Sequence, residues 1–310
     1  MTSLPDALHV GFSKCASTFL QAFFEGHADI FLVNQSHFFA PFEFSKYRTG
    51  KEDYGRLFEK AGTGQVKLES DEHILLPLFH PVLEAAATTL SSIGEVSIRI
   101  KDIQPKSKII IVIRNQVDLI VSRYSEYVLG GGKGDFEFFV NEFLRCSKDG
   151  VNYFQNYYSQ IIEIFRTDFG AENVLVLLQE ELSRNEAQTI EQLCRFLDIR
   201  TQQPSRHGLA SRRVGLSNLG LKVVRAINRA IVTRQEMSYK RAEVRIPYLL
   251  YKIVQRTIRT LDYYLPKSIK GDKNAIVTPA LGARIRDEFR DDNLMLEKCL
   301  CRDLSTLGYR

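Results

Sequence analysis

A run of five consecutive β-branched residues, Ile109 to Ile113, is the feature that most restricts the fold of this chain. β-Branched side chains favour strands, and an apolar run without alternation indicates a strand that is buried on both faces. Strands of this kind lie at the centre of parallel sheets. The stretch from Lys108 to Arg114 is therefore predicted to be a central parallel strand, which ends in Arg114 and continues into a helix through Ser122.

Three further apolar stretches are predicted to be strands: one that begins at Leu8, one from Gln65 to Glu69 and one from Asn173 to Leu178. Helical patterns separate them. This alternation predicts an α/β fold with a central parallel sheet and helices on both faces. Ligands of such sheets bind beyond the carboxyl ends of the strands. Because Lys14, Glu69 and Arg114 each lie at or just after a strand end, we expect all three at one edge of the sheet.

The C-terminal third is predicted to be mostly helical. Two basic amphipathic helices are expected at Asn218 to Ile231 and Pro247 to Leu265, and a closing helix at 279 to 304. In the second, one apolar stripe is expected from Leu250, Val254, Ile258, Leu261 and Leu265, with Lys252, Arg256 and Arg259 off it. An earlier helical stretch is expected from 136 to 169. We predict one domain over 1–310, with an α/β nucleotide-binding core at 1–205, a basic helical cap region at 206–275 and a closing helix at 276–310.

Composition and charge narrow the function classes. No run approaches the length of a membrane span, the N-terminus lacks a signal peptide pattern, and the five cysteines show no disulfide framework, so we expect a cytoplasmic protein. Between Arg206 and Lys273, sixteen Lys and Arg face four Asp and Glu, which gives this segment +12 in a chain of net charge +5. The surplus indicates either a solvated basic face or an anionic partner such as a nucleotide, a glycan or an anionic membrane surface. A nucleic-acid partner is not expected.

The stretch from Leu8 to Leu20 is predicted to hold a phosphate. It combines a short strand, a tight turn containing Lys14, and a helix start with Ser17 and Thr18. The first N–H groups of a helix have no intrahelical acceptors, and the helix dipole favours negative charge there. A Walker A loop would place Lys directly before a Ser or Thr. Here Lys14 precedes Ser17 by three positions, so a kinase or ATPase is a poorer explanation.

The turn resembles the first nucleotide-binding signature of the PAPS-dependent sulfotransferases, roughly P-K-x-G-T-T-x-L. It reads Ser13-Lys14-Cys15-Ala16-Ser17-Thr18-Phe19-Leu20, with Ser13 for the usual Pro, Ala16 for Gly and Ser17 for Thr. The Ala is the most consequential difference, because a Cβ limits how closely the backbone can approach a phosphate. The family's second signature, a strand ending in Arg and a Ser eight residues later, is matched by Arg114 and Ser122. Similarity to bacterial members extends to F-G-A-E-N-V-L-V-L-L and to the C-terminal helix.

The resemblance implies a P-loop-like fold and transfer of a sulfuryl group from PAPS to a hydroxyl or amine, with 3′,5′-ADP (PAP) as product. It implies that Lys14 stabilises the leaving group, that Arg114 and Ser122 hold the 3′-phosphate, and that the turn holds the 5′-phosphate through Lys14, Cys15, Ala16, Ser17, Thr18 and Phe19. No metal is expected. A third cofactor contact is assigned to Ser211, Arg212 and Arg213, for which a solvated basic loop is the alternative.

The catalytic base is assigned to Glu69, because many members carry a Glu at the end of this strand. The alternative for Glu69 is a carboxylate at a helix N-terminus, and His73 is the second candidate for the base. The acceptor is expected to be a glycan, a glycolipid or a small natural product, and aromatic residues between 37 and 58 are candidates to line its site. Two other functions remain open: a P-loop kinase with an unusual loop, and a non-catalytic protein of the same fold that binds anions or a membrane surface through 206–273.

Overall fold

The structure, a computed structural model, describes residues 4–34, 51–72, 74–75, 90–148, 157–202, 215–234 and 243–310. Five parallel strands form the central sheet in the order β2-β3-β1-β4-β5. Their bounds are β1 (Ala7–His9), β2 (Ile30–Asn34), β3 (Val66–Ser70), β4 (Lys108–Ile113) and β5 (Val174–Leu178). The predicted α/β class is confirmed, and β4 is central with Ile109 to Ile113 fully buried, as its β-branched run predicted.

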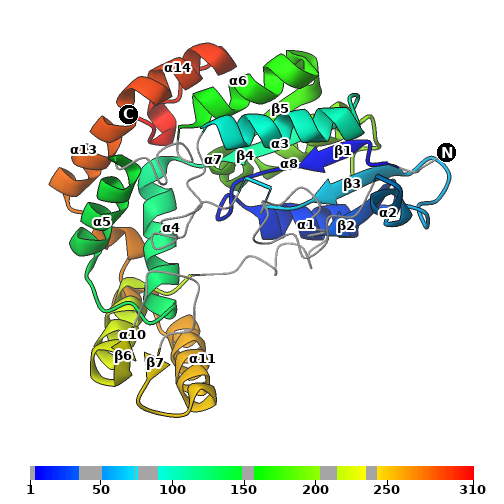
Figure 1. The fold of residues 1–310 in the computed structure, drawn as a ribbon. Coiled ribbons are helices and arrows are strands. Elements are labelled where there is room, and N and C mark those ends of the chain that lie inside the picture. The colour runs from blue at the N-terminus through cyan, green and yellow to red at the C-terminus, as the bar shows by residue number, and fades with distance from the viewer. Residues whose placement is uncertain are drawn as a thin grey trace.

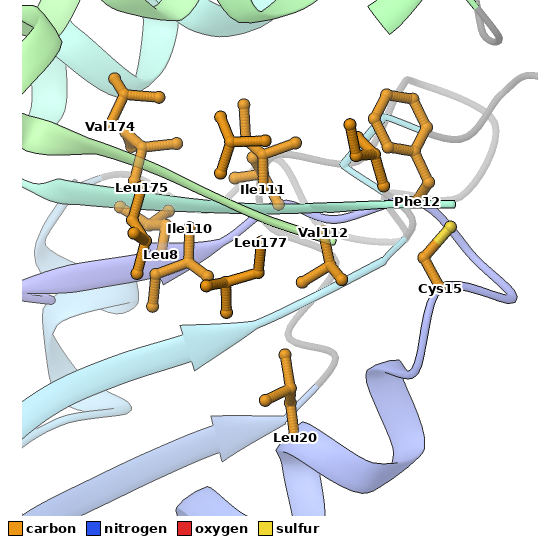
Figure 2. Packing of buried hydrophobic residues seen from close by; sticks show 14 of the residues in the cluster. Leu8, Phe12, Cys15, Leu20, Ile110, Ile111, Val112, Val174, Leu175 and Leu177 are labelled. Carbon is orange, nitrogen blue, oxygen red and sulfur yellow. The ribbon is translucent and has the colours of Figure 1, made fainter. Parts of the chain in front are cut away.

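Helices cover both faces of the sheet (Figure 1). One face carries α3 (Leu90–Ile103) and α6 (Tyr158–Phe169), with α14 (Arg290–Leu300) packed on α6, and the other carries α1 (Ser17–Glu25). The short α2 (Lys51–Arg56) lies near the β2 edge, while α7 (Gln179–Arg184) and α8 (Glu186–Leu197) follow β5. The main core fills the sheet interior, where Leu8, Ile110, Val112 and Leu177 lie together (Figure 2).

A second apolar core joins α4 (Gln116–Leu129) to the C-terminal region. It includes buried residues of α5 (Phe136–Lys148), α10 (Asn218–Ile231) and α13 (Pro279–Glu288). The remaining elements are the two-strand hairpin of β6 (Val232–Arg234) and β7 (Glu243–Val244), α11 (Tyr248–Tyr264), α12 (Lys267–Lys270), and three short 3₁₀ helices, η2 (Ala171–Asn173), η3 (Lys273–Ile276) and η4 (Ser305–Leu307). Because α4 starts at the end of β4 and reaches the second core, it links the sheet edge to the basic region.

Two predicted helices are wrong in extent. The stretch 136–169 contains two separate helices, α5 and α6, and Tyr157 precedes α6 in a non-helical conformation. The closing helix is also two helices, α13 and α14, which meet at Phe289 with φ −102° and ψ 9°. Phe289 is buried and its ring lies against Tyr157, so tertiary packing fixes a bend that the apolar pattern alone did not indicate.

The residues of the apolar stripe predicted for α11 differ in burial. Leu250 and Leu261 are 47% and 62% exposed, whereas Val254, Ile258 and Leu265 are half-buried and Ile258 packs against the second core. The buried side chains of this helix are Tyr251, Gln255 and Asp262, which form hydrogen bonds to α4, to α10 and to the N-cap of α10. Among the helices of the described residues, none is long and apolar enough to cross a membrane.

Candidate active site

The turn between β1 and α1 has the geometry of an anion site. Ala16 is the N-cap of α1, and the N–H groups of Phe19 and Leu20 donate to its carbonyl oxygen at 3.0 and 3.1 Å. The N–H groups of Ser17 and Thr18 precede these bonds, so they have no intrahelical acceptor. Lys14 and Ala16 adopt left-handed backbone conformations, with φ 68° and 65°. The predicted strand, tight turn and helix start are therefore all present.

Left-handed conformations are costly for residues with a Cβ, by roughly 1 kcal/mol each. Ala16 lies where the resembled signature has Gly, and its φ explains why Gly is suited to this position. The chain tolerates Ala there because Cys15 on one side and α1 on the other fix the backbone. Cys15 is fully buried (Figure 2), and its N–H donates to the Phe12 carbonyl oxygen at 3.3 Å.

Burial raises the pKa of the Cys15 thiol to about 12. The thiol therefore stays protonated and points into the core, so Cys15 can contribute to a ligand site only through its backbone. This excludes a thiolate nucleophile at the turn.

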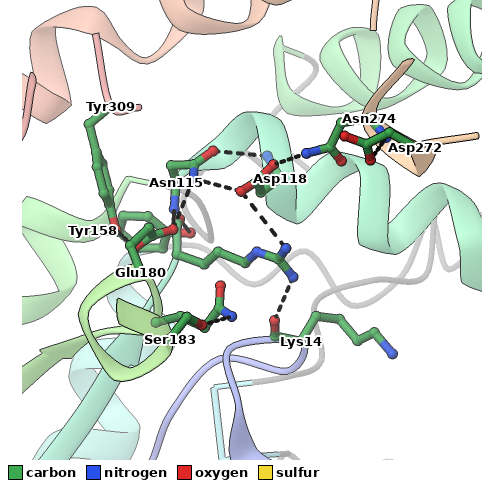
Figure 3. A network of polar contacts seen from close by, with 11 residues as sticks. Lys14, Asn115, Asp118, Tyr158, Glu180, Ser183, Asp272, Asn274 and Tyr309 are labelled. Atoms are coloured by element: carbon green, nitrogen blue, oxygen red, sulfur yellow. Dashed lines mark hydrogen bonds and ion pairs between the residues drawn. The ribbon is translucent and has the colours of Figure 1, made fainter. Parts of the chain in front are cut away.

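Arg114 joins the end of β4 to the turn. Its Nη1 donates to the Lys14 carbonyl oxygen at 3.3 Å, and its Nη2 lies 3.9 Å from Asp118 Oδ2 (Figure 3). Its Nε is buried without a hydrogen-bond partner among the described residues. A buried guanidinium with an unused N–H is suited to an incoming oxyanion. Lys14 and Arg114 are thus in contact, through the backbone carbonyl of Lys14 and the side chain of Arg114.

The Lys14 ammonium reaches α4. Its Nζ lies 2.9 Å from Glu126 Oε1, and Arg123 Nη1 lies 3.8 Å from Glu126 Oε2. Ser122, one helical turn before Glu126, is half-buried on the same helix. The turn, the end of β4 and α4 therefore bring Lys14, Arg114 and Ser122 into one region. In that region Glu126 is paired with the ammonium of Lys14.

A buried polar network positions the Arg114 corner. Asn115 caps α4 through a bond from the Asp118 N–H (2.9 Å), and its own N–H and Nδ2 each donate to Glu180 Oε1 at 2.9 Å (Figure 3). The Tyr158 hydroxyl donates to the Arg114 carbonyl oxygen at 2.7 Å, and the Tyr309 hydroxyl lies 3.4 Å from Glu180 Oε2. Burial raises the pKa of Glu180, and the hydrogen bonds from Asn115 oppose that rise. The C-terminal segment, through the contact of Tyr309 with Glu180, thus touches the network that fixes the start of α4.

Two carboxylates lie next to the turn on the β3 side. Glu69 is fully buried within β3, beside Leu8 of β1 in the sheet register, and accepts a bond from the Tyr54 hydroxyl. The alternative interpretation of Glu69 as a helix-terminal carboxylate is therefore wrong. Glu72 accepts a bond from the Ser17 hydroxyl and so contacts the turn directly. His9 is buried nearby, and its Nδ1 forms a hydrogen bond with Ser70 Oγ at 2.8 Å. Burial lowers the pKa of His9 to about 4.

Lys273 is a candidate site residue that the sequence analysis missed. Burial lowers its pKa and the charges of Arg114 and Lys14 lower it further, whereas the charges of Asp118 and Asp272 raise it. The preceding Asp272 caps η3, and Asn274 Nδ2 donates to Asp118 Oδ1 at 3.1 Å, which fixes η3 beside α4 (Figure 3). A detectable signal existed, because Lys270-Gly271-Asp272-Lys273 is a second basic, glycine-containing segment like the one at 211–215.

The other predicted residues, His73, Ser211, Arg212 and Arg213, lie outside the described residues, as do the aromatic residues between 37 and 50. Among the described residues no cluster of His, Cys, Asp and Glu has the arrangement of a metal site.

Comparison with known proteins places this geometry in a family. Residues 4–210 match the sulfotransferase domain family. The structure is similar to a sulfotransferase from Alicyclobacillus acidocaldarius, with a TM-score of 0.60 and 20% identity over 99% of this chain and 100% of that one. A mouse sulfotransferase, SULT7A1 complexed with PAP, matches with a TM-score of 0.48 and 14% identity over 96% of this chain and 87% of that one. No curated protein matches at a significant level. Because the family match spans most of the chain, this protein belongs to the sulfotransferase family, the PAPS-dependent enzymes predicted from its two signatures.

Proposed function

We propose that the protein transfers a sulfuryl group from PAPS to a hydroxyl or amine of a glycan, glycolipid or small natural-product acceptor, and releases 3′,5′-ADP. The observation that supports this most is the bond from Arg114 Nη1 to the Lys14 carbonyl oxygen. This bond holds two anion-binding features side by side: the N-terminus of α1 and the arginine at the end of β4. A 3′,5′-bisphosphate has two anionic groups that would occupy both.

In this proposal the N–H groups at the start of α1 bind the 5′-phosphate, with the Ser17 and Thr18 hydroxyls beside them. Arg114 and Ser122 bind the 3′-phosphate. Lys14 moves from Glu126 to the oxygen that joins the 5′-phosphate to the sulfuryl group, where negative charge grows as the S–O bond breaks. The acceptor oxygen or nitrogen attacks the sulfur from the opposite side, and 3′,5′-ADP leaves with the bonding electron pair.

The acceptor must lose a proton during this attack, and Glu69 is the proposed base. Its backbone lies beside Leu8 in β1, the strand that leads into the Lys14 turn, and its carboxylate accepts a bond from the Tyr54 hydroxyl. Glu72 is the second candidate, because it follows β3 closely and contacts the turn through the Ser17 hydroxyl. His73 remains a proposal from the sequence.

Space for the acceptor is proposed beside Lys273. A cavity of about 660 Å³ is lined there by Arg259, Asp262, Tyr264, Lys270 and Lys273, among others. Tyrosine rings and cations suit a sugar or an anionic group. The next residue, Asn274, donates to Asp118, which in turn lies 3.9 Å from Arg114 Nη2, so we propose that this cavity borders the donor site.

Calorimetry with 3′,5′-ADP, ADP and Mg²⁺-ATP tests the donor assignment. We expect 3′,5′-ADP to bind most tightly, and Lys14→Ala and Arg114→Ala each to weaken it by about tenfold or more. Lys101→Ala, whose ammonium lies 3.9 Å from Asp168 away from the site, is the matched control. Preference for Mg²⁺-ATP would support the kinase alternative instead. A screen of hydroxyl and amine acceptors with labelled PAPS then identifies the acceptor, and binding without turnover on any acceptor would support the non-catalytic alternative.

A further inference from the structure

Helix α11 packs against the protein with its polar side. The Tyr251 hydroxyl donates to Asn228 Oδ1 at 2.9 Å, and Gln255 Nε2 donates to the Leu129 carbonyl oxygen at 2.8 Å. Asp262 accepts from the Ser217 N–H at 2.9 Å and from the Ser217 hydroxyl. These three residues recur at helical spacing and are all buried, so hydrogen bonds to the end of α4 and to both ends of α10, together with Ile258 on the second core, fix the side that turns inward.

The outward side of α11 is apolar. Leu249, Leu250, Ile253 and Leu261 are 73%, 47%, 51% and 62% exposed, and Tyr264 at the end of the helix is 77% exposed. These residues are spaced by three, four and eight positions, so they lie on one side of the helix and form one stripe. Seven of the thirteen large apolar side chains reported as exposed in the described residues lie between 249 and 269, so the exposure is a local feature of this region rather than a general property of the surface.

Positive charge runs along one edge of this stripe. Lys252, Arg256 and Arg259 are the cations of α11, and both arginines are exposed with no carboxylate within salt-bridge distance among the described residues. The single acid of the helix, Asp262, is buried on the opposite side. The outward face is therefore apolar and cationic, and no carboxylate of the described residues pairs with its two arginines.

We propose that the outward face of α11 docks this protein on an anionic lipid bilayer. An interfacial helix buries an apolar stripe at the level of the headgroups while Lys and Arg contact lipid phosphates, and Tyr is favoured at that depth. A second copy of the chain is a poorer occupant, because pairing two such faces would bring like charges together. The helix would lie in the plane of the surface, since it is too short and too polar to cross it.

Docking would also orient the proposed acceptor cavity, a consequence that rests on the proposed function. Arg256 and Arg259 line that cavity as well as the edge of the stripe. A bound membrane would therefore present headgroups to the cavity, which favours a glycolipid among the proposed acceptors. The binding test below measures no sulfuryl transfer, so failure of docking and failure of the proposed reaction are distinguishable.

Vesicle co-sedimentation of the full chain tests the docking surface, using phosphatidylcholine vesicles with and without phosphatidylglycerol. We expect binding only to the anionic vesicles and weakening as salt rises. The triple variant Leu250→Ser, Ile253→Ser, Leu261→Ser and the double variant Arg256→Glu, Arg259→Glu should each weaken binding by about tenfold or more. The matched control is Leu294→Ser, Met295→Ser, which changes exposed apolar side chains on α14. Equal binding by the wild type and the triple variant, or no binding by the wild type, would overturn the proposal.

A fluorescence measurement locates the contact independently of these variants. The chain contains no tryptophan, so Tyr264→Trp and, as a control on α5, Phe138→Trp each introduce one reporter at an exposed position. Anionic vesicles should shift the emission of the first to shorter wavelength and leave the second unchanged. A concentration-dependent dimer that the triple variant abolishes, without a shift on vesicles, would assign the face to a second copy and overturn the proposal.

Discussion

The Nζ atom of Lys14 lies 2.9 Å from Glu126 Oε1, so the cation proposed to bind the donor is paired with a carboxylate from α4. Ser17 is paired similarly with Glu72. Two acidic side chains therefore contact the groups that would meet phosphates. A ligand must displace both carboxylates, and their negative charge opposes its approach.

Glu126→Gln is expected to tighten 3′,5′-ADP binding. Both side chains of the Lys14–Glu126 pair are partly exposed, at 31% and 44%, so the pair is worth no more than about 1 kcal/mol and the gain should be roughly two- to fivefold in Kd. Calorimetry measures it directly. Glu142→Gln breaks a comparable surface pair with Arg145 on α5 and should leave Kd unchanged. Weaker binding in Glu126→Gln would show that Glu126 positions Lys14 for the ligand rather than competing with it.

Ala16→Gly should improve ligand binding without loss of stability. Glycine relieves the cost of φ 65° and permits closer approach of a phosphate, while its greater freedom in the unfolded chain offsets part of the gain. We expect the free energy of unfolding to stay within about 1 kcal/mol of the wild type and Kd for 3′,5′-ADP to fall roughly threefold. The control is Ala22→Gly within α1, which should cost about 1 kcal/mol. Equal destabilisation by both substitutions would contradict the strain at Ala16.

The elements that the sequence predicted well are those with strong local signals. The β-branched run of β4 and the turn around Lys14 are determined by neighbouring residues, and both were located correctly. The strand β2, the helix α3 and the hairpin β6–β7 were not predicted. They depend on pairing with distant segments, as Ile30 does with Val66, and such partners cannot be found from periodicity alone.

The candidate site was predictable to the same extent. Strand ends predicted that Lys14 and Arg114 lie together, and a hydrogen bond joins them, whereas Glu69 is buried within β3, level with Ile109 in the register of the sheet. Lys273 was missed, since its position depends on η3 packing against α4 more than 150 residues away in the chain. The burial of Tyr251, Gln255 and Asp262 in α11 could not be predicted from periodicity, because it depends on hydrogen bonds to distant residues.

Glu69→Gln and Glu72→Gln distinguish the two candidate bases. Loss of the base should lower kcat by about 10²- to 10⁴-fold while Kd for 3′,5′-ADP stays the same. We expect this for Glu69→Gln, and for Glu72→Gln only a change of a few fold in Kd through its contact with Ser17. Single-turnover kinetics with the acceptor from the labelled-PAPS screen separates the two effects. The reverse pattern would assign the base to Glu72.

Lys273→Ala should weaken 3′,5′-ADP binding. Burial and the charges of Arg114 and Lys14 lower the pKa of Lys273, while Asp118 and Asp272 oppose this, so an anionic ligand bound at Arg114 and Lys14 would add a favourable charge for the Lys273 ammonium. Removing one cation should raise Kd by about tenfold and should slightly stabilise the free protein, because like-charge repulsion falls. Calorimetry and urea unfolding report the two quantities. Lys222→Ala, on the exposed side of α10, is the control, and equal Kd values for the two variants would remove Lys273 from the site.

Stability should decrease between about pH 4 and pH 6 because of Asp292. This residue is 3% exposed at the start of α14, and burial raises the pKa of its carboxyl to about 6, while hydrogen bonds from Ser159 oppose the rise. An unfolded aspartate titrates near 3.9, so in this window the folded state keeps a proton that the unfolded state releases, and the free energy of unfolding falls as pH rises. Asp292→Asn keeps an oxygen that can accept from Ser159 and removes the titration. Urea unfolding across this range should show a flatter profile for the variant, by on the order of 2 kcal/mol, whereas Asp291→Asn, at an exposed position one residue earlier, should keep the wild-type slope. A wild-type slope in Asp292→Asn would show that another group carries the pH dependence.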